Sequence, residues 1–213
     1  MDISWLGHAC VRVRTQHAAV IMDPCDKQSG YDMGRPTADI VTVSHADPHH
    51  SYIRGVRGDP VHITGPGEYE ISGVQIIGIA THLRPATEGV PPERNIAYML
   101  ETEDLSLAHL GGLGTPLTAE QTEQLSNVDI VMLPIGGGST LDPEQAARAV
   151  RDLDPTVVIP LHYPAQGPDS ENGPLKAFIS SLGVEPGESV RRVSIQRRGL
   201  GEGLRLVLLE PRG

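Results

Sequence analysis

The amino-acid sequence predicts a mixed α/β fold in which two β-sheets are covered by outer helices. The first half of the chain alternates short apolar runs with turn residues, and the second half adds helical patterns between strands. The 213 residues include 24 glycines and 18 prolines, which indicates many short elements joined by tight turns. Because neither an internal repeat nor a low-complexity linker interrupts the chain, we expect one domain over residues 1–213.

Short apolar runs bounded by turn residues predict the strands. In the first half they cover residues 2–6, 11–14, 18–22, 39–43, 61–64 and 74–80. A hairpin is predicted next, with strands at 96–100 and 105–108 and a turn at Glu103-Asp104. Further strands are predicted at 129–133 and 156–160, and a C-terminal hairpin at 189–196 and 204–209.

Capping signals predict the helices. Thr118, with Gln121 three residues later, forms a capping box at the start of one helix. Asp142 before Pro143 predicts the N-cap and first turn of a second helix, and Gly183 predicts the end of a third. The three helices are expected at residues 118–125, 142–153 and 174–182.

The composition argues against several classes of protein. The net charge of −10 and the lack of a basic run argue against a nucleic-acid partner. No stretch approaches 18 consecutive apolar residues and the chain opens on a strand-like segment, so we expect a cytoplasmic protein with no membrane partner. Cys10 and Cys25 are not part of a CxxC pair, and we expect buried thiols in a reducing compartment.

A histidine-rich loop is the strongest indication of chemistry. His45, Asp47, His49 and His50 fall within six residues, directly after the predicted strand at 39–43. A loop lets neighbouring side chains converge on one point, which the alternation of a strand would forbid. Imidazole and carboxylate groups suit zinc and related divalent ions. The alternative interpretation is a polar surface loop.

Further histidines share this context. His82, His109 and His162 each follow an apolar run that is predicted to be a strand. If these strands run in the same sense, all of the sites open on one edge of the sandwich. Taken singly, each of the three could be structural. His17 and His62 lack the pattern, and we interpret them as ordinary.

Several segments match a known family in the right order. They are Trp5-Leu6-Gly7-His8-Ala9-Cys10, Met22-Asp23-Pro24, Val43-Ser44-His45 through His50, Thr81-His82, Ala108-His109-Leu110-Gly111-Gly112-Leu113-Gly114, Leu133-Pro134-Ile135-Gly136-Gly137 and Pro160-Leu161-His162-Tyr163. The chain resembles the metallo-β-lactamase superfamily and, within it, the L-ascorbate-6-phosphate lactonase-like branch of metal-dependent hydrolases. The resemblance implies a four-layer αββα sandwich. It also implies hydrolysis of a small ester, lactone or phosphoester by metal-bound water.

The chain departs from the family's HxHxDH and HLGDLG motifs. Asp47 stands where the second histidine is expected, and His49 stands where the aspartate is expected. Gly112 replaces the carboxylate that bridges two metal ions in the family. The resemblance therefore implies altered catalytic groups at His49 and Asp47. It implies one or two zinc or manganese ions, or none at all.

The implied ligands fall into two sets. One set contains His45, Asp47 and His82, and the other contains His49, His50 and His162. Asp23 is expected to orient a histidine or to cap a turn. His8 is expected to be a buried turn histidine, with a place along the same edge as the alternative.

Two rival functions stay open. A non-catalytic binding protein on the same fold is consistent with glycine at position 112. A serine or cysteine hydrolase would need Ser44 or Cys10 as nucleophile, but the sequence has no nucleophile elbow. We expect a small-molecule substrate for the hydrolase, whereas the cleft of a binding protein would be a ligand or partner surface; the sequence does not indicate an oligomeric state.

Overall fold

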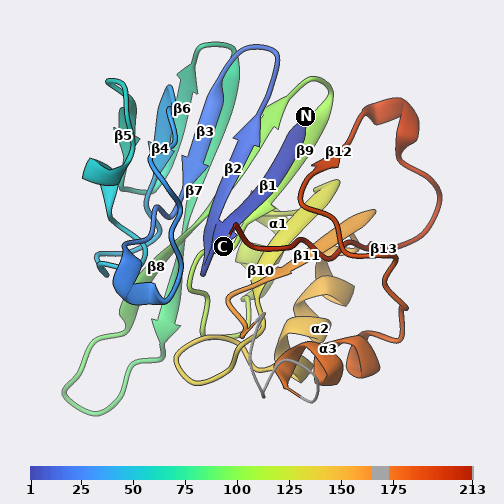
Figure 1. Ribbon diagram of the computed structural model, residues 1–213. Coiled ribbons are helices and arrows are strands. Elements are labelled where there is room, and N and C mark those ends of the chain that lie inside the picture. Colours follow the sequence, from blue (N-terminus) through green and yellow to red (C-terminus); the bar gives the residue numbers. More distant parts are fainter. Residues whose placement is uncertain (165–172, 213) are drawn as a thin grey trace.

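The computed structural model describes residues 1–164 and 173–212, which form two β-sheets and three α-helices (Figure 1). In spatial order the first sheet contains β12 (Val193–Ser194), β1 (Asp2–Gly7), β2 (Cys10–Arg14), β3 (Ala19–Met22), β4 (Ile40–Thr42) and β5 (Val61–Ile63). The second sheet contains β13 (Arg205–Leu206), β11 (Val157–Leu161), β10 (Ile130–Pro134), β9 (Leu105–His109), β8 (Glu93–Thr102), β7 (Val74–Arg84) and β6 (Gly67–Ile71). The predicted combination of two sheets with outer helices is confirmed.

The main core lies between the sheets and is aliphatic. Val20 and Met22 of β3 belong to it, whereas Ile21 between them belongs to a second cluster on the outer face of the first sheet. This alternation follows from the two-residue period of a strand. The hydroxyl of Tyr98 in β8 crosses the core and lies 3.0 Å from the Val43 carbonyl oxygen, to which it donates. The sheets are thus joined by a hydrogen bond as well as by apolar packing.

The helices α1 (Ala119–Gln124), α2 (Pro143–Leu153) and α3 (Pro174–Leu182) begin and end where the capping residues predict. The Thr118 hydroxyl accepts from the backbone N–H of Gln121 at 3.2 Å, which completes the predicted capping box. Asp142 accepts from the backbone N–H of Gln145 at 2.8 Å. Gly183 ends α3 with a φ of 72°, in the left-handed region that glycine adopts without strain. The predicted starts of α1 and α2 and the predicted end of α3 are therefore set by local sequence.

The helices cover one sheet only. Helix α1 contacts β7, and α2 packs between β10 and α3. Over the outer face of the first sheet, the described residues form loops with the 3₁₀ turns Lys27–Ser29 and Ile53–Gly55, and no α-helix. The fold class is confirmed, with a fourth layer of loops in place of helices. None of the described helices is long and apolar enough to cross a bilayer.

The predicted C-terminal hairpin is wrong. Strand β12 pairs antiparallel with β1, and β13 pairs parallel with β11 in the other sheet. Each segment satisfies backbone groups that β1 and β11 would otherwise leave unpaired at a sheet edge. The connector between them contains a 3₁₀ turn at Arg197–Gly199, which gives the chain room to reach both sheets.

Two further strand predictions need correction in extent. The sequence predicts no strand between residues 64 and 74, but β6 starts at Gly67 and pairs antiparallel with β7. Strand β7 extends beyond the predicted residue 80 to Arg84, because β8 pairs with it as far as Glu93. The predicted hairpin of β8 and β9 is confirmed, and its turn residues Glu103 and Asp104 both have a φ of 57°.

Candidate metal centre

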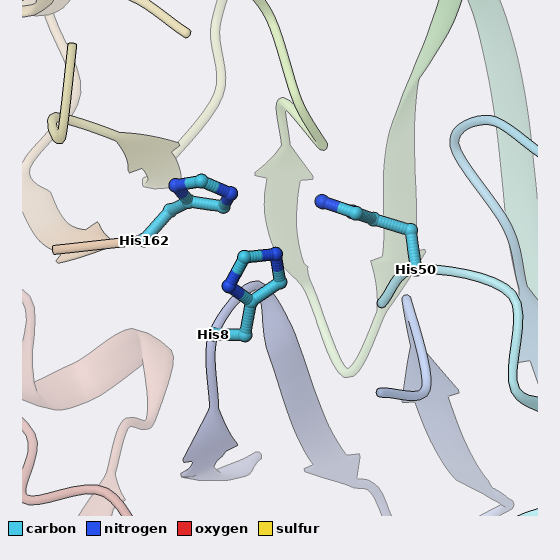
Figure 2. A group of neighbouring side chains, drawn as sticks. All are labelled: His8, His50 and His162. Carbon is cyan, nitrogen blue, oxygen red and sulfur yellow. The ribbon is translucent and has the colours of Figure 1, made fainter. Parts of the chain in front are cut away.

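Three histidines from distant segments converge at one edge of the sandwich. His8 follows β1, His50 lies in the loop after β4, and His162 follows β11. Figure 2 shows their rings turned toward one another. One ring nitrogen of each lies within 4.8 Å of the others, as is needed for a common metal ion. We call these residues the histidine trio.

The backbone around the trio is in an unusual conformation. His8 and His162 have φ angles of 53° and 56°, and Asp23 has a φ of 48°. Side chains other than glycine, asparagine and aspartate rarely adopt this left-handed region, and such residues cluster at functional sites. The carbonyl of His8 accepts from the His162 N–H at 3.1 Å and from the Trp5 indole N–H at 2.8 Å. These bonds fix the turn that presents His8 and tie it to the turn that presents His162.

A buried carboxylate holds the third member of the trio. The Nδ1–H of His50 donates to Asp23 at 2.7 Å, which leaves Nε2 as the His50 nitrogen with a free lone pair. Asp23 also accepts from the backbone N–H of Ser44 at 2.7 Å and from its hydroxyl at 2.6 Å. Burial would raise the pKa of Asp23, but its electrostatic attraction to His50 and the hydrogen bond from His50, together with the contributions of His109 and Ser44, outweigh burial and lower this pKa to about 2. Asp23 therefore acts as an ionised carboxylate that orients His50.

The electrostatics keep the other two rings neutral. Burial, and after it the neighbouring imidazole of His162, lowers the pKa of His8 to about 2. Burial, and after it the imidazole of His50, lowers the pKa of His162 to about 4. A neutral imidazole has the lone pair that a metal ion requires. The donor set of the trio therefore fits a divalent ion that prefers nitrogen ligands, such as zinc.

The space above Gly112 is filled. A Cβ atom added to Gly112 would lie 2.8 Å from His45 Cε1 and 2.8 Å from a methyl carbon of Leu83. The ring of His45 stands beside His50, with centroids 4.1 Å apart. His45 Nδ1 lies 2.9 Å from the Ser44 hydroxyl oxygen, and burial lowers the pKa of His45. A side chain at position 112 would thus meet the ring of His45, which lies next to the trio rather than within it.

Asp47 and His49 lie at the margin of the trio. Asp47 accepts from the backbone N–H of His49 at 2.8 Å, which stabilises the turn of the loop. His49 Nδ1 bonds Asp26 at 2.8 Å, its side chain is 34% exposed, and its ring centroid is 5.7 Å from that of His8. The structure therefore brings both residues near the site, held by partners of their own.

Two other candidates lie away from the trio. His82 is inside β7, where its neighbour Thr81 bonds the buried Asn95 and Leu83 lines the cavity beside the trio. Because side chains alternate over the regular step from Thr81 to His82, His82 faces away from the buried side on which Thr81 bonds Asn95. His109 is buried at the end of β9, and its Nε2 bonds the Ala9 carbonyl oxygen at 2.9 Å. The structure does not bring either ring into the group of three.

Two cavities meet at the trio. One, of about 620 Å³, is lined by His45, Asp47, His50 and His162, with Arg84 and Arg94 among its other residues. The other, of about 520 Å³, is lined by His8 and His162 together with Tyr31, Gly136 and other residues. His162 lines both cavities, so a ligand has room on either side of its ring.

Sequence reasoning underestimated His8. It was expected to be a buried turn histidine, and the structure places it within the trio. The signal that could have found it is its position directly after the strand-like segment 2–6, the same context that drew attention to His162. Spacing alone could not show that residues 8 and 162 meet.

Two facing sheets with three histidines that converge at their strand ends define a two-sheet α/β protein with a candidate metal centre. The chain belongs to the metallo-β-lactamase superfamily: its residues 2–162 match the beta-lactamase superfamily domain. This confirms the resemblance at the level of the superfamily.

The chain is similar to proteins that are named metal-dependent hydrolases. A UPF0173 metal-dependent hydrolase from Methanopyrus kandleri is 27% identical, over 90% of this chain and 100% of that protein. A second, from Lysinibacillus sphaericus, is 26% identical over 76% of this chain and 85% of the relative.

Solved structures agree with this assignment. A metallo-β-lactamase superfamily protein from Thermotoga maritima is 28% identical with a TM-score of 0.79, and the match covers 98% of each chain. A metallo hydrolase from Ignicoccus hospitalis shares the fold at 21% identity, with a TM-score of 0.61 over 100% of this chain and 95% of the other.

Proposed function

We propose that the protein is a metal-dependent hydrolase of a small ester, lactone or phosphoester, with one divalent ion held by His8, His50 and His162. The convergence of their ring nitrogens within 4.8 Å is the observation that carries this proposal. The names of the relatives support the reaction class, and the Thermotoga maritima protein is named as a Zn-dependent hydrolase. The lactonase-like branch stays a prediction for the substrate.

One ion rather than two follows from the residues around Gly112. A second ion would need the bridging carboxylate, and the ring of His45 stands in its place. Three imidazoles also match zinc better than manganese, which prefers oxygen ligands. A bound ion would supply Lewis acidity and lower the pKa of a water molecule.

The protein's own residues have separate roles in this proposal. Asp23 keeps Nδ1 of His50 protonated and so keeps Nε2 available. The Ser44 hydroxyl donates to Asp23, so its oxygen accepts from His45 Nδ1–H, and His45 Nε2 is left without a proton. We assign to His45 Nε2, which belongs to a residue lining the larger cavity, the acceptance of a proton from water.

The remaining predictions from the sequence keep the status of proposals. Asp47 lines the larger cavity and His49 stands beside His8, so both remain candidates for catalytic or ligand roles. The sequence also predicts His45 and His82 as ligands, and the experiment below tests the trio against that prediction. One domain over residues 1–213, a cytoplasmic location and a small-molecule substrate are also retained from the sequence.

The decisive experiment is the metal content of protein purified without a metal-affinity tag, by plasma mass spectrometry. We expect about one equivalent of zinc in the wild type and its loss in His8→Ala, His50→Ala and His162→Ala. His45→Ala and His82→Ala are the matched controls and should retain the metal. Equal retention in all five variants would contradict the trio as the ligand set.

Activity needs a second measurement. Wild-type protein should hydrolyse some members of a panel of small esters, lactones and phosphoesters, and a chelator should abolish the reaction. Zinc should restore it. Turnover that persists in metal-free protein would contradict the proposed mechanism.

A non-catalytic binding protein is the second candidate, favoured by the missing carboxylate at Gly112. Folded protein that takes up no zinc would support it, and metal uptake after Gly112→Asp would then indicate a lost site. The serine or cysteine hydrolase gains no support, because Ser44 is 1% exposed and Cys10 is fully buried.

A further inference from the structure

Two thiols lie together on the outer face of the first sheet, and the proposed function uses neither. Cys10 begins β2, and Cys25 lies two residues after Asp23. Both belong to the second apolar cluster, and Gly7, whose carbonyl oxygen Cys25 Sγ approaches, is the strand partner of Cys10. Cys10 Sγ also lies 3.9 Å from Met33 Sδ, and Cys25 Sγ lies 3.7 Å from the Gly7 carbonyl oxygen. Two free thiols in one cluster, on backbone segments that lie side by side, are the starting point for a disulfide.

Cys25 lines a surface cavity. A cavity of about 670 Å³ has Cys25, Met33 and Tyr52 in its lining, and Cys10 is not among its lining residues. A small oxidant that enters this cavity therefore meets Cys25 first. Cys10 lies behind it, in position to react with whatever forms on Cys25.

The surroundings of Cys25 favour reaction at its sulfur. The neighbouring Cys10 thiol lowers the pKa of Cys25, and this effect outweighs burial. A hydrogen bond with Ser29 lowers it further. Because the thiolate is the reactive form of cysteine, these effects distinguish Cys25 from an inert buried thiol.

We propose that Cys25 is a peroxide-reactive cysteine and that Cys10 is its resolving partner in an intramolecular disulfide. The Cys25 thiolate attacks one oxygen of hydrogen peroxide, so that an S–O bond forms, the O–O bond breaks and hydroxide leaves. The Cys10 sulfur then attacks the Cys25 sulfur, so that the S–S bond forms and the oxygen leaves as water. In sum, two thiols lose two hydrogens and one peroxide is reduced to two waters.

The test uses the full-length, reduced, metal-free protein and hydrogen peroxide alone. After treatment and quenching, the protein is unfolded, its free thiols are alkylated, and its intact mass and peptides are measured. We expect the loss of two hydrogens, protection of both cysteines from alkylation, a linked peptide pair and full reversal by dithiothreitol. Alkylation of both cysteines as in untreated protein would overturn the proposal, as would oxygen addition at Met33 before any thiol reacts.

Two single variants separate the roles of the cysteines. In Cys10→Ser, dimedone should trap a sulfenic acid on Cys25, whereas in Cys25→Ser dimedone should not label Cys10. Equal labelling of the two variants would overturn the assignment of Cys25 as the reactive thiol. Alanine versions, checked by circular dichroism, replace any serine variant that fails to fold. Because no metal or substrate is present, this result is independent of the hydrolase proposal.

Discussion

The histidine-rich edge has two halves that differ in how they are held. In the histidine trio, His50 bonds a buried carboxylate, and the turns of His8 and His162 are tied together through the backbone. In the other half, which we call the Gly112 pocket and define as His45, Asp47 and Gly112, the space of a carboxylate is filled by a ring. The difference teaches that outer partners, and not the number of histidines in a motif, decide which side chains can share an ion.

The largest expected effect comes from removing a trio imidazole. Asparagine tolerates the left-handed backbone, so His8→Asn and His162→Asn should keep the turns and lose the ring. We expect zinc affinity to fall by at least about a hundredfold, since loss of an outer partner alone costs about 10–100-fold. Competition with a chromophoric chelator measures this affinity. His45→Asn is the control from the Gly112 pocket, and an equal loss there would remove the distinction between the halves.

Removing the shared carboxylate should have the next largest effect. Asp23→Asn leaves an amide that cannot accept from both His50 and Ser44 as the carboxylate does. We expect zinc affinity to fall by about 10–100-fold. We also expect the free energy of unfolding to fall by about 2 kcal/mol. Chelator competition and urea unfolding measure the two effects, and an unchanged zinc affinity would contradict the orienting role of Asp23.

A substitution in the Gly112 pocket should lower the free energy of unfolding and leave zinc affinity unchanged. Gly112→Ala pushes its methyl against His45 and Leu83, which overpacks the site and should cost about 1–3 kcal/mol. The matched control is Gly201→Ala, where nothing lies within 4 Å, and its effect should stay within about 0.5 kcal/mol. Urea unfolding of the two variants provides the comparison. Equal stability of the pair would show that His45 moves freely out of the pocket.

A helix cap far from both halves should give the smallest effect. Asp142→Ala removes the side chain that accepts from Gln145 and should cost about 1 kcal/mol. Zinc affinity should not change, because α2 supplies no residue to the trio. Thermal unfolding and chelator competition test both statements. A drop in zinc affinity would mean that general destabilisation alone loosens the trio, and the first two tests would then lose their meaning.

The sequence correctly predicted the helix starts and the hairpin turn, which depend on residues close together in the chain. The caps at Thr118 and Asp142 bond within their own first turns, so three residues of sequence were enough to place α1 and α2. The hairpin turn at Glu103-Asp104 is local in the same sense. The trio residues His50 and His162 were also among the candidates, because each follows an apolar strand.

Long-range pairing determined what the sequence could not show. Strands β12 and β13 have only two residues each, and their partners β1 and β11 lie far away in the chain. His82 was expected at the end of a strand, but pairing with β8 extends β7 to Arg84, so His82 lies inside the strand. The ring of His45 fills the space beside Gly112. The pattern of residue types along the sequence does not predict this contact.

The carbonyl of His8 has a consequence for the order of folding. It accepts from Trp5 within the same turn and from His162 at the end of β11, so it joins the first sheet to the second. Contacts between residues this far apart in the chain form slowly, since a large loop must close before they gain any energy. We therefore expect zinc uptake to be a late event in refolding, and a stopped-flow zinc indicator would report the moment at which the two sheets dock.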